Sequence, residues 1–188
     1  MNCPLCDRSL DPTTLTESDG AQAGLPGFEC PQGHGVFVPS DVYLDWQTAS
    51  EEAAPETAPR VADSDEVGDV KRAKLCPQDG RIMRRFRISA DGGFWIDRCS
   101  TCGGAWFDGD EWQATVDAGL AQHLPQIFSD AWQRRVEEAL TGLDHRSRLA
   151  EAAGEDDLGR VDAFREWIWS HPQRHLLLAR LNDRPAQT

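Results

Sequence analysis

The sequence of 188 residues lacks long apolar runs and has few basic residues relative to acidic ones. No stretch approaches the ~18–20 apolar residues that a membrane-spanning helix needs, so we expect no membrane insertion. Lysine and arginine together number 19 against 32 acidic residues, which gives a net charge of −13. Because nonspecific nucleic-acid binding depends on basic side chains that neutralise phosphates, this charge disfavours nucleic acid and anionic membranes as partners. Another protein is the partner that we expect.

The short motifs of common catalytic sites are also missing. The chain has no nucleophile elbow, phosphate loop or His-Glu metalloprotease motif, so we expect that it is not an enzyme. The first residues, Met1-Asn2-Cys3-Pro4, have neither the basic region nor the apolar run of a secretory leader. We therefore expect a cytoplasmic protein, in a reducing compartment where paired cysteines more often hold a metal than form disulfides.

What the sequence does contain is six cysteines, and each of them fits a metal-ligand pattern. Zinc takes four ligands in a tetrahedron, and two cysteines on one tight turn supply two adjacent corners. The first set has the spacing C-x2-C-x23-C-x3-H and consists of Cys3, Cys6, Cys30 and His34. The alternative is that His34 is only a turn residue and that water or another group fills the fourth corner.

The second set has three cysteines, Cys76, Cys99 and Cys102, with Asp79 at the position where a fourth cysteine is expected. A carboxylate oxygen is an acceptable zinc ligand, although structural sites favour thiolate. Asp79 therefore completes the tetrahedron in our preferred interpretation. In the alternative, Asp79 caps the turn and water or His123 takes the fourth position. The expected cofactor is Zn²⁺, with two ions per chain.

The residues around the second set suggest a family. Cys76-Pro77-x-x-Gly80 is followed by Ile96-Asp97-x-Cys99-x-x-Cys102-Gly103-Gly104-x-Trp106-Phe107-Asp108-x-x-Glu111. This motif resembles the bacterial zinc-ribbon family named after transcription factor IIB, over about residues 75–115. Members commonly have cysteine where Asp79 stands. The resemblance implies zinc binding, and it does not by itself imply a role in transcription.

Four segments follow from these patterns. Residues 1–46 are expected to form a first zinc ribbon, a diverged copy of the second one at residues 73–112. Residues 47–72 are rich in alanine, proline and acidic residues, so we predict a flexible acidic linker. Residues 113–188 are predicted to be helical. The fold class is therefore small α+β: two ribbons of short β-hairpins plus a helical C-terminal region.

The helical region has apolar residues at helical spacing from residue 127 to residue 143. Gly142 is expected to interrupt or end this helix. A second helix is predicted over about residues 160–169, and the His171-Pro172 pair should break it before a last short helix at residues 173–181.

Five arginines surround the second ribbon, interleaved with aromatic residues: Arg81, Arg84, Arg85, Arg87 and Arg98. Basic and aromatic side chains on a small sheet can bind single-stranded nucleic acid. They can equally solvate a strand and neutralise nearby acids, which is the interpretation that we favour. Our leading hypothesis is a noncatalytic adaptor that binds another protein. The second hypothesis is a transcription-associated, nucleic-acid-binding protein, and the third is a zinc-dependent enzyme centred on Asp79. The oligomeric state is left open.

Overall fold

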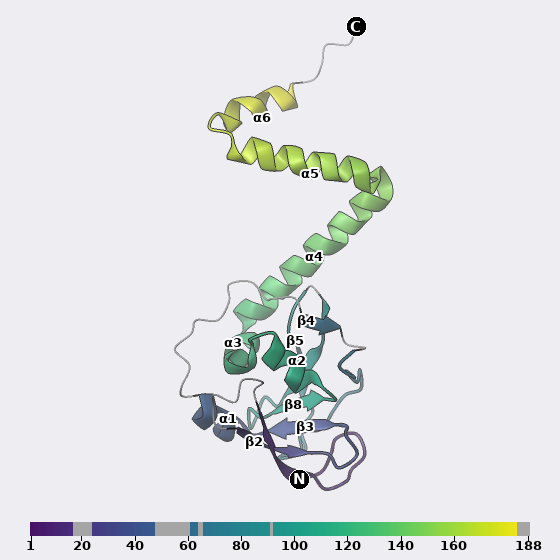
Figure 1. The fold of residues 1–188 in the computed structure, drawn as a ribbon, viewed down its shortest axis with the longest axis vertical. Coiled ribbons are helices and arrows are strands. Elements are labelled where there is room, and N and C mark those ends of the chain that lie inside the picture. The colour runs from purple at the N-terminus through teal and green to yellow at the C-terminus, as the bar shows by residue number, and fades with distance from the viewer. Residues whose placement is uncertain (17–23, 48–60, 64–65, 91, 184–188) are drawn as a thin grey trace. The chain divides into compact units, whose positions relative to one another are not determined.

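The computed structural model describes residues 1–16, 24–47, 61–63, 66–90 and 92–183 (Figure 1). The strands are β1 (Asp11–Leu15), β2 (Leu25–Glu29), β3 (Gly35–Val38), β4 (Val61–Asp63), β5 (Arg84–Arg87), β6 (Gly92–Gly93), β7 (Trp95–Arg98) and β8 (Ala105–Asp108). The helices are α1 (Ser40–Gln47), α2 (Glu111–Asp117), the 3-10 helix η1 (Ala121–His123), α3 (Leu124–Ile127), α4 (Asp130–Ala153), α5 (Glu155–Ser170) and α6 (Arg174–Asn182). The expected small α+β fold is confirmed.

The chain divides into two compact units, Met1–Leu140 and Thr141–Thr188. In the first unit, six strands form one sheet in the order β1-β2-β3-β8-β7-β5, and every neighbouring pair is antiparallel. Strands β1 to β3 come from the first predicted ribbon, here called ribbon 1. Strands β5, β7 and β8 come from the second, called ribbon 2. The two ribbons therefore share a continuous sheet through the β3–β8 pair.

The register of that pair is symmetric between the ribbons. A shift of 69 positions carries Cys30 onto Cys99 and Phe37 onto Trp106. Phe37 and Trp106 are also direct partners across β3 and β8. A residue that pairs with its own equivalent in an antiparallel ladder marks a local two-fold relation. The ribbons therefore join through equivalent edge strands, which covers an edge that each ribbon would otherwise expose.

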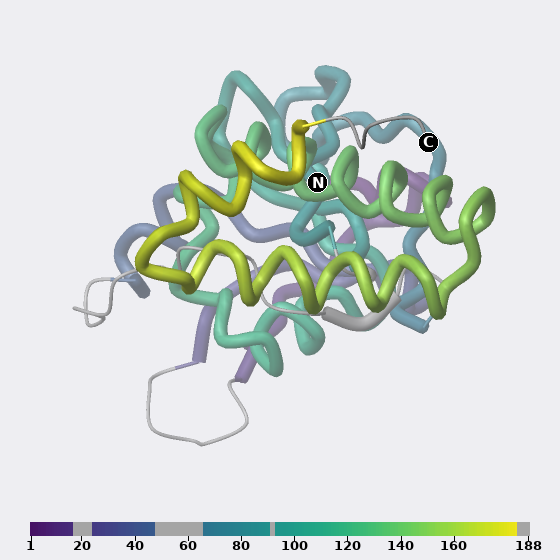
Figure 2. Tube along the Cα trace, turned by 90° about the horizontal axis from the view of Figure 1, so that it is seen from above, coloured from purple at the N-terminus to yellow at the C-terminus, as the bar shows by residue number. Residues whose placement is uncertain are grey.

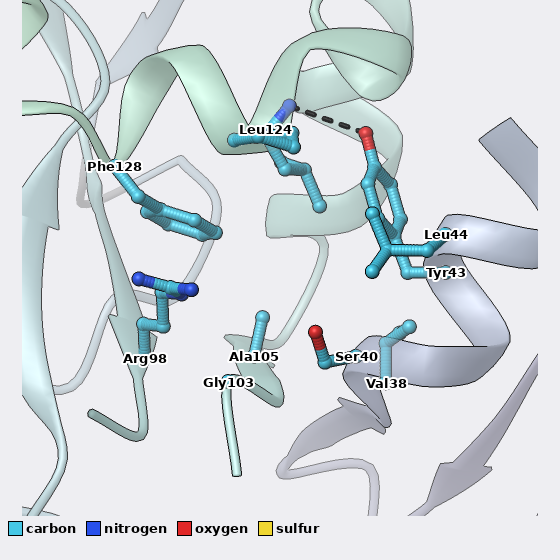
Figure 3. Close-up of a pocket in the computed structure, with 10 residues that line it drawn as sticks. Val38, Ser40, Tyr43, Leu44, Arg98, Gly103, Ala105, Leu124 and Phe128 are labelled. Carbon is cyan, nitrogen blue, oxygen red and sulfur yellow. Dashed lines mark hydrogen bonds between the residues drawn. The ribbon is translucent and has the colours of Figure 1, made fainter. Parts of the chain in front are cut away.

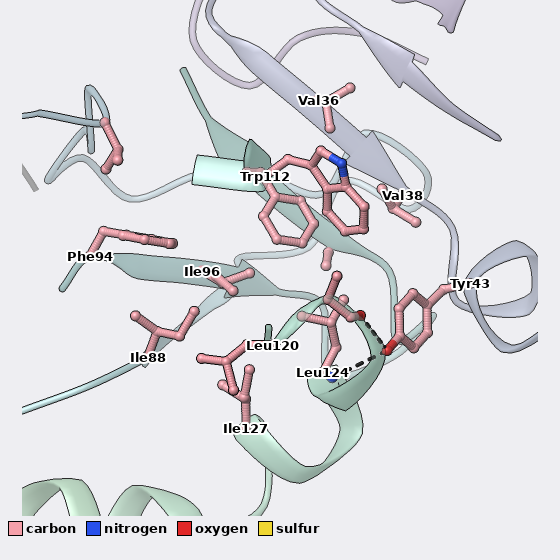
Figure 4. Packing of buried hydrophobic residues seen from close by; sticks show 14 of the residues in the cluster. Val36, Val38, Tyr43, Ile88, Phe94, Ile96, Trp112, Leu120, Leu124 and Ile127 are labelled. Atoms are coloured by element: carbon pink, nitrogen blue, oxygen red, sulfur yellow. Dashed lines mark hydrogen bonds between the residues drawn. The ribbon is translucent and has the colours of Figure 1, made fainter. Parts of the chain in front are cut away.

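One face of the sheet carries the main hydrophobic core of the first unit (Figure 4). Alternate residues of the strands, such as Val36, Val38, Ile96 and Phe107, pack there against α1, α2 and the helices that follow. Trp132 of α4 is 1% exposed, and its Nε1 donates to the carbonyl of Ile88 at 3.1 Å. The start of α4 is thus fixed to ribbon 2 by burial and by a hydrogen bond.

Tyr43 of α1 connects ribbon 1 to the helices after ribbon 2. Its hydroxyl donates to the carbonyl of Ala121 at 2.9 Å and accepts the N–H of Leu124 at 3.2 Å (Figure 4). Both partners are backbone groups at η1 and the start of α3. A buried tyrosine hydroxyl needs such partners, and here they satisfy two helix-end groups.

The second unit, residues 141–188, is helical where it is described, up to residue 183. After His171-Pro172 the chain turns, and α6 folds back along α5 (Figure 2). The prediction that Gly142 interrupts its helix was wrong, because α4 continues through this residue to Ala153. The actual break is at Gly154, whose φ of 89° starts the turn into α5. A single glycine weakens a helix by only about 1 kcal/mol, which eleven further helical residues after it outweigh.

Most of the predicted linker, residues 48–60 and 64–65, lies outside the described residues. Residues 61–63 form β4, which pairs with β6, and residues 66–72 lie next to ribbon 2. Val67 is 4% exposed, and its carbonyl accepts the N–H of Asp110 at 3.1 Å. In the described part of the chain, no helix is both long enough and apolar enough to span a membrane.

Candidate metal centres

The cysteines lie in four tight turns, two in each ribbon, which begin at Cys3, Cys30, Cys76 and Cys99. In each turn the N–H of the first cysteine donates to a carbonyl five residues later: Cys3 to Arg8, Cys30 to Gly35, Cys76 to Arg81 and Cys99 to Gly104, at 2.7–2.9 Å. We call these four turns knuckles. Three of them also close with an N–H from the residue four positions after that cysteine: Asp7, Gly80 and Gly103.

These three closing residues have positive φ values of 61°, 72° and 76°. Glycine adopts this left-handed conformation without strain, and aspartate is among the few other residues that tolerate it. The knuckle at Cys30 differs, because Gly33 takes the left-handed conformation one position earlier and His34 follows it. This shift explains why ribbon 1 has the spacing C-x3-H in place of C-x2-C.

The first cluster, here called site 1, brings Cys3, Cys6, Cys30 and His34 together, with their donor atoms all within 4.8 Å of one another. The Sγ atoms of Cys6 and Cys30 are 3.6 Å apart. His34 Nδ1 lies 3.7 Å from Cys3 Sγ and 3.5 Å from Cys30 Sγ. The imidazole therefore faces the thiols through Nδ1, at the corner that the sequence assigned to it.

The second cluster, site 2, brings together Cys76, Asp79, Cys99 and Cys102 within the same limit. The Sγ atoms of Cys76 and Cys102 are 3.5 Å apart, and Asp79 Oδ2 lies 3.2 Å from Cys99 Sγ. His123, the alternative fourth ligand, is not part of this cluster and lies buried in η1. Asp79 is exposed at the outer side of the site.

The donor separations match a tetrahedral zinc ion. A tetrahedron with Zn–S bonds of about 2.3 Å has edges of about 3.8 Å. The sulfur–sulfur and sulfur–nitrogen distances of site 1 are 3.5–3.7 Å, and in site 2 the Cys76–Cys102 sulfur–sulfur distance is 3.5 Å and the Cys99–Asp79 sulfur–oxygen distance is 3.2 Å. Four of the thiols also accept a backbone N–H at 3.4 Å: Cys3 from Leu5, Cys30 from Gln32, Cys99 from Thr101 and Cys102 from Gly104. Such donors stabilise a thiolate, so the residues fit zinc in geometry and in chemistry.

The ionisation of the metal-free donors is set mainly by burial. It raises the pKa of the Cys3 and Cys76 thiols to about 12 and also raises the pKa of Cys102. At Cys30, burial opposes ionisation, but the N–H groups of Gln32 and His34 bring its pKa down to about 7. The N–H of Arg81 lowers the pKa of Asp79, so this carboxylate is ionised at neutral pH. Zinc must therefore displace protons from Cys3, Cys76 and Cys102 when it binds.

Both sites border one small hydrophobic cluster, on the opposite face of the sheet from the main core. Phe37 and Trp106, each 0% exposed, lie between the cysteines of the two ribbons. Leu10 and Met83 pack in it from equivalent positions, seven residues after Cys3 and Cys76. The sites thus share packing partners, although they share no ligand.

An ion network beside ribbon 2 was not predicted from the sequence. Lys74 is 0% exposed, and its Nζ lies 2.6 Å from both Asp97 Oδ2 and Asp108 Oδ2. Asp108 also accepts the N–H of Val70 at 2.8 Å and Trp106 Nε1 at 2.6 Å. The network ties the segment before ribbon 2 to β7 and β8.

Glu111 has the most strongly shifted pKa among the carboxyl groups of this region. It is 0% exposed, and its Oε2 accepts the N–H of Asp108 at 2.8 Å. Its carboxylate oxygens lie within 4.8 Å of those of Asp69 and Asp108. Burial, followed by the charge of Asp108, raises the pKa of Glu111 to about 10, so it is protonated at neutral pH. Glu111 is the first residue of α2, and its carboxyl group connects this helix to the end of β8.

The five arginines divide into two groups. Arg85 pairs with Asp69, Arg87 Nε donates to the carbonyl of Ser89 at 2.8 Å, and both guanidinium groups lie over the Trp95 ring. Arg84 and Arg98 are opposite each other in the β5–β7 pair, and neither forms an ion pair with a described acidic residue. Arg81 Nη1 donates to Thr101 Oγ1 at 3.1 Å. Three of the five are thus engaged within the fold, and Arg84 and Arg98 are available to a ligand.

Paired knuckles on short antiparallel strands, with four donors at each, define the zinc ribbon as the class of this module. Residues 75–118 match the family model described as transcription factor zinc-finger, so this segment is a zinc ribbon of the transcription factor IIB type. The match covers 44 of the 188 residues and confirms the resemblance for ribbon 2. No curated protein and no solved structure matches the chain. The family match and the two clusters together support zinc binding.

Proposed function

We propose that the protein is a noncatalytic, zinc-stabilised interaction protein that binds two structural zinc ions and presents its helices to a partner protein. The observation that carries the zinc part is the convergence of four donors in each cluster at tetrahedral separations. Site 1 uses Cys3, Cys6, Cys30 and His34. Site 2 uses Cys76, Asp79, Cys99 and Cys102. Each ribbon is too small to fold on apolar burial alone, so metal binding contributes folding free energy.

Structural roles for both ions are supported by the ligand count. A catalytic zinc keeps an open coordination position for water, whereas both sites have four protein donors. Three thiolates at site 2 also make the ion electron-rich and therefore a poor Lewis acid. An enzyme centred on Asp79 is tested by replacing Asp79 with cysteine, which closes that corner with a fourth thiolate. Retained protein function and tighter zinc binding support the structural role, whereas hydrolytic activity that disappears in the variant contradicts it.

The interaction role is supported by the surface of the second unit taken by itself. In residues 141–183, only Leu158 and Ile168 are buried apolar residues. Large apolar side chains on α5 and α6 are instead 43–57% exposed: Val161, Phe164, Trp167, Trp169, Leu176 and Leu181. Aromatic residues of this kind dominate the binding energy of protein interfaces. So many exposed apolar side chains on α5 and α6 favour a surface that binds a protein partner over helices that remain solvated.

Affinity capture of the tagged full-length chain from its native cells, with quantitative mass spectrometry, tests this role. Trp169→Ser and Leu176→Ser remove exposed apolar side chains, and Arg165→Ser is the matched control on the same helices. We expect a stoichiometric protein partner with the native chain and the control, and a ~30-fold or greater loss of affinity with Trp169→Ser. Equal recovery with all four chains contradicts the proposal.

Nucleic-acid binding is the second candidate, supported by the family description and by the two arginines without acidic partners. Replacing Arg84 and Arg98 by glutamate reverses the charge of both these residues and leaves the Arg85–Asp69 pair unchanged. Fluorescence anisotropy with single-stranded DNA and RNA across salt concentrations measures the effect. Under the leading proposal, neither the native chain nor the variant binds at physiological salt. Salt-dependent binding that the variant loses favours this second candidate.

A further inference from the structure

An apolar cavity lies where α1 of ribbon 1, the last knuckle of ribbon 2 and α3 come together (Figure 3). Its volume is about 120 Å³, and it lies entirely within the first unit. The residues that line it are Val38, Ser40, Tyr43, Leu44, Arg98, Gly103, Ala105, Leu124, Pro125 and Phe128. Three separate parts of the sequence thus build one small hollow.

The size of the cavity limits what it can hold. An apolar cavity of about 150 Å³ accommodates a benzene molecule, so this one accepts one compact group, such as a leucine or phenylalanine side chain. Drug-sized ligands occupy roughly 300–1,000 Å³, and longer lipid chains need more room than this hollow provides. The walls, formed by side chains such as Leu124, Phe128 and Leu44, suit an apolar group.

One cation faces this apolar space. The guanidinium of Arg98 lies beside the Phe128 ring, with Cζ 5.2 Å from the ring centroid (Figure 3). Among the described residues, no acidic side chain pairs with Arg98, and Arg84 stands directly opposite it in the β5–β7 ladder. Two neighbouring arginines without acidic partners attract an anion, even in a chain of net charge −13.

The polar side of the cavity also has a small hydrogen-bonding group. Ser40 lines it, and a Cβ at Gly103 would lie 2.8 Å from Ser40 Oγ and 3.6 Å from Arg98 Nη2. Glycine therefore keeps the space between the hydroxyl and the guanidinium open. A ligand bound here can therefore contact the Arg98 guanidinium, the Ser40 hydroxyl and the apolar walls of the cavity at the same time.

We propose that this cavity binds the C-terminal residue of a partner protein, with its apolar side chain in the hollow and its terminal carboxylate on Arg98. A guanidinium binds a carboxylate through two parallel hydrogen bonds, and burial beside Phe128 strengthens them. Ser40 donates to the carboxylate or accepts from the last peptide N–H. The inference rests on the proposed interaction role, because the ligand is a segment of a protein partner.

The test is an NMR titration of the purified, zinc-loaded full-length chain with N-acetyl-leucine and with its uncharged amide. We expect N-acetyl-leucine to shift the amide signals of Leu44, Gly103 and Phe128 with a dissociation constant on the order of 1 mM. The amide should bind ~10-fold more weakly, because it lacks the charge-assisted hydrogen bonds. Equal binding of acid and amide, or no saturable shifts up to ~20 mM acid, overturns the proposal.

Variants and a second probe sharpen the result. Arg98→Gln should weaken N-acetyl-leucine ~10-fold, Arg98→Lys should retain part of the affinity, and Arg134→Gln, an exposed arginine of α4, should have no effect. A variant that fails to fold is recognised by its reduced zinc content. The comparison of N-acetyl-leucine with its amide uses the native chain alone, so it tests the proposal even if a variant misfolds. Tighter binding of 4-methylpentanoate than of N-acetyl-leucine overturns the peptide source, since that acid lacks the peptide group.

The two proposals fail separately. The capture experiment changes residues of α5 and α6, whereas the titration uses small probes on the first unit. If the α5 and α6 variants recover partners as the native chain does, and N-acetyl-leucine still binds, then the cavity is a carboxylate site and the surface of the second unit is not the docking site. If the probes fail and capture succeeds, the interaction role stands and the cavity is not its binding site.

Discussion

At the scale of single residues, knuckle spacing predicts all eight candidate metal donors, because it places them within a few positions of one another in each turn. The sequence left alternatives open for His34 and Asp79, and the structure brings both side chains to their clusters. The spacing of residues within each turn is therefore enough to predict the candidate metal ligands. Residues whose role depends on distant partners, such as Lys74, are a different case.

Glu111 gives a prediction about pH. Its pKa is about 10 in the folded chain, whereas an unfolded glutamate has the usual value of about 4.3. Between these values the folded state holds a proton that the unfolded state has lost, so the stability contributed by this group falls as the pH rises. Glu111→Gln keeps an acceptor for the N–H of Asp108 and removes the titration.

We therefore expect the free energy of unfolding of Glu111→Gln, relative to the native chain, to rise by up to about 1 kcal/mol per pH unit. Urea denaturation with saturating zinc, between about pH 6.5 and pH 8.5, measures this difference. Glu151→Gln, an exposed glutamate of α4, is the control and should follow the native profile. Parallel profiles for Glu111→Gln and the native chain would show that Glu111 ionises normally.

At the scale of elements, the β3–β8 pair decides how the two ribbons behave. Phe37 and Trp106 lie at its centre, fully buried between the cysteines of both sites. Phe37→Ala should destabilise the zinc-loaded chain by about 3–5 kcal/mol, since it opens a cavity where the ribbons meet. Urea denaturation measures the cost, and Thr14→Ala on the exposed side of β1 is the control. A cost below about 1 kcal/mol would mean that the ribbons fold independently.

Gly142 gives the second prediction at this scale. It lies inside α4, and a Cβ added there meets no other atom within 4 Å. Gly142→Ala should therefore slow amide hydrogen exchange in the surrounding helical turns, by stabilising the helix by about 0.5–1 kcal/mol. Gly80→Ala, which places alanine at a φ of 72°, should instead weaken its knuckle. Faster exchange around residue 142 in the variant would contradict the helix seen here.

The elements also show how far the sequence predicts the fold. Helices at about residues 160–169 and 173–181 were expected close to where α5 and α6 are found, because their breaker, His171-Pro172, is local. The Gly142 prediction failed because a single glycine costs less than a long helix gains. The β3–β8 pair was not predicted, since antiparallel partners 69 positions apart in the repeat leave no local signal.

At the scale of the whole molecule, the first unit is a pair of ribbons joined through equivalent strands. The internal repeat in the sequence indicated duplication, but not that the copies share one sheet. The same long-range assembly creates the cavity beside Arg98, because its walls come from ribbon 1, ribbon 2 and α3. The proposed cavity site therefore depends on how the two ribbons join, whereas each metal cluster depends on the knuckles of one ribbon.

Zinc stoichiometry tests the central claim most directly, by elemental mass spectrometry on purified protein. We expect two zinc ions per chain, with His34→Ala and Asp79→Ala each weakening one of them. The control substitutions His175→Ala and Asp11→Ala lie outside both clusters and should leave two ions bound. One ion per chain, or none, would contradict the account, because a ribbon without its metal has neither the tetrahedral site nor the folding energy assigned to it here.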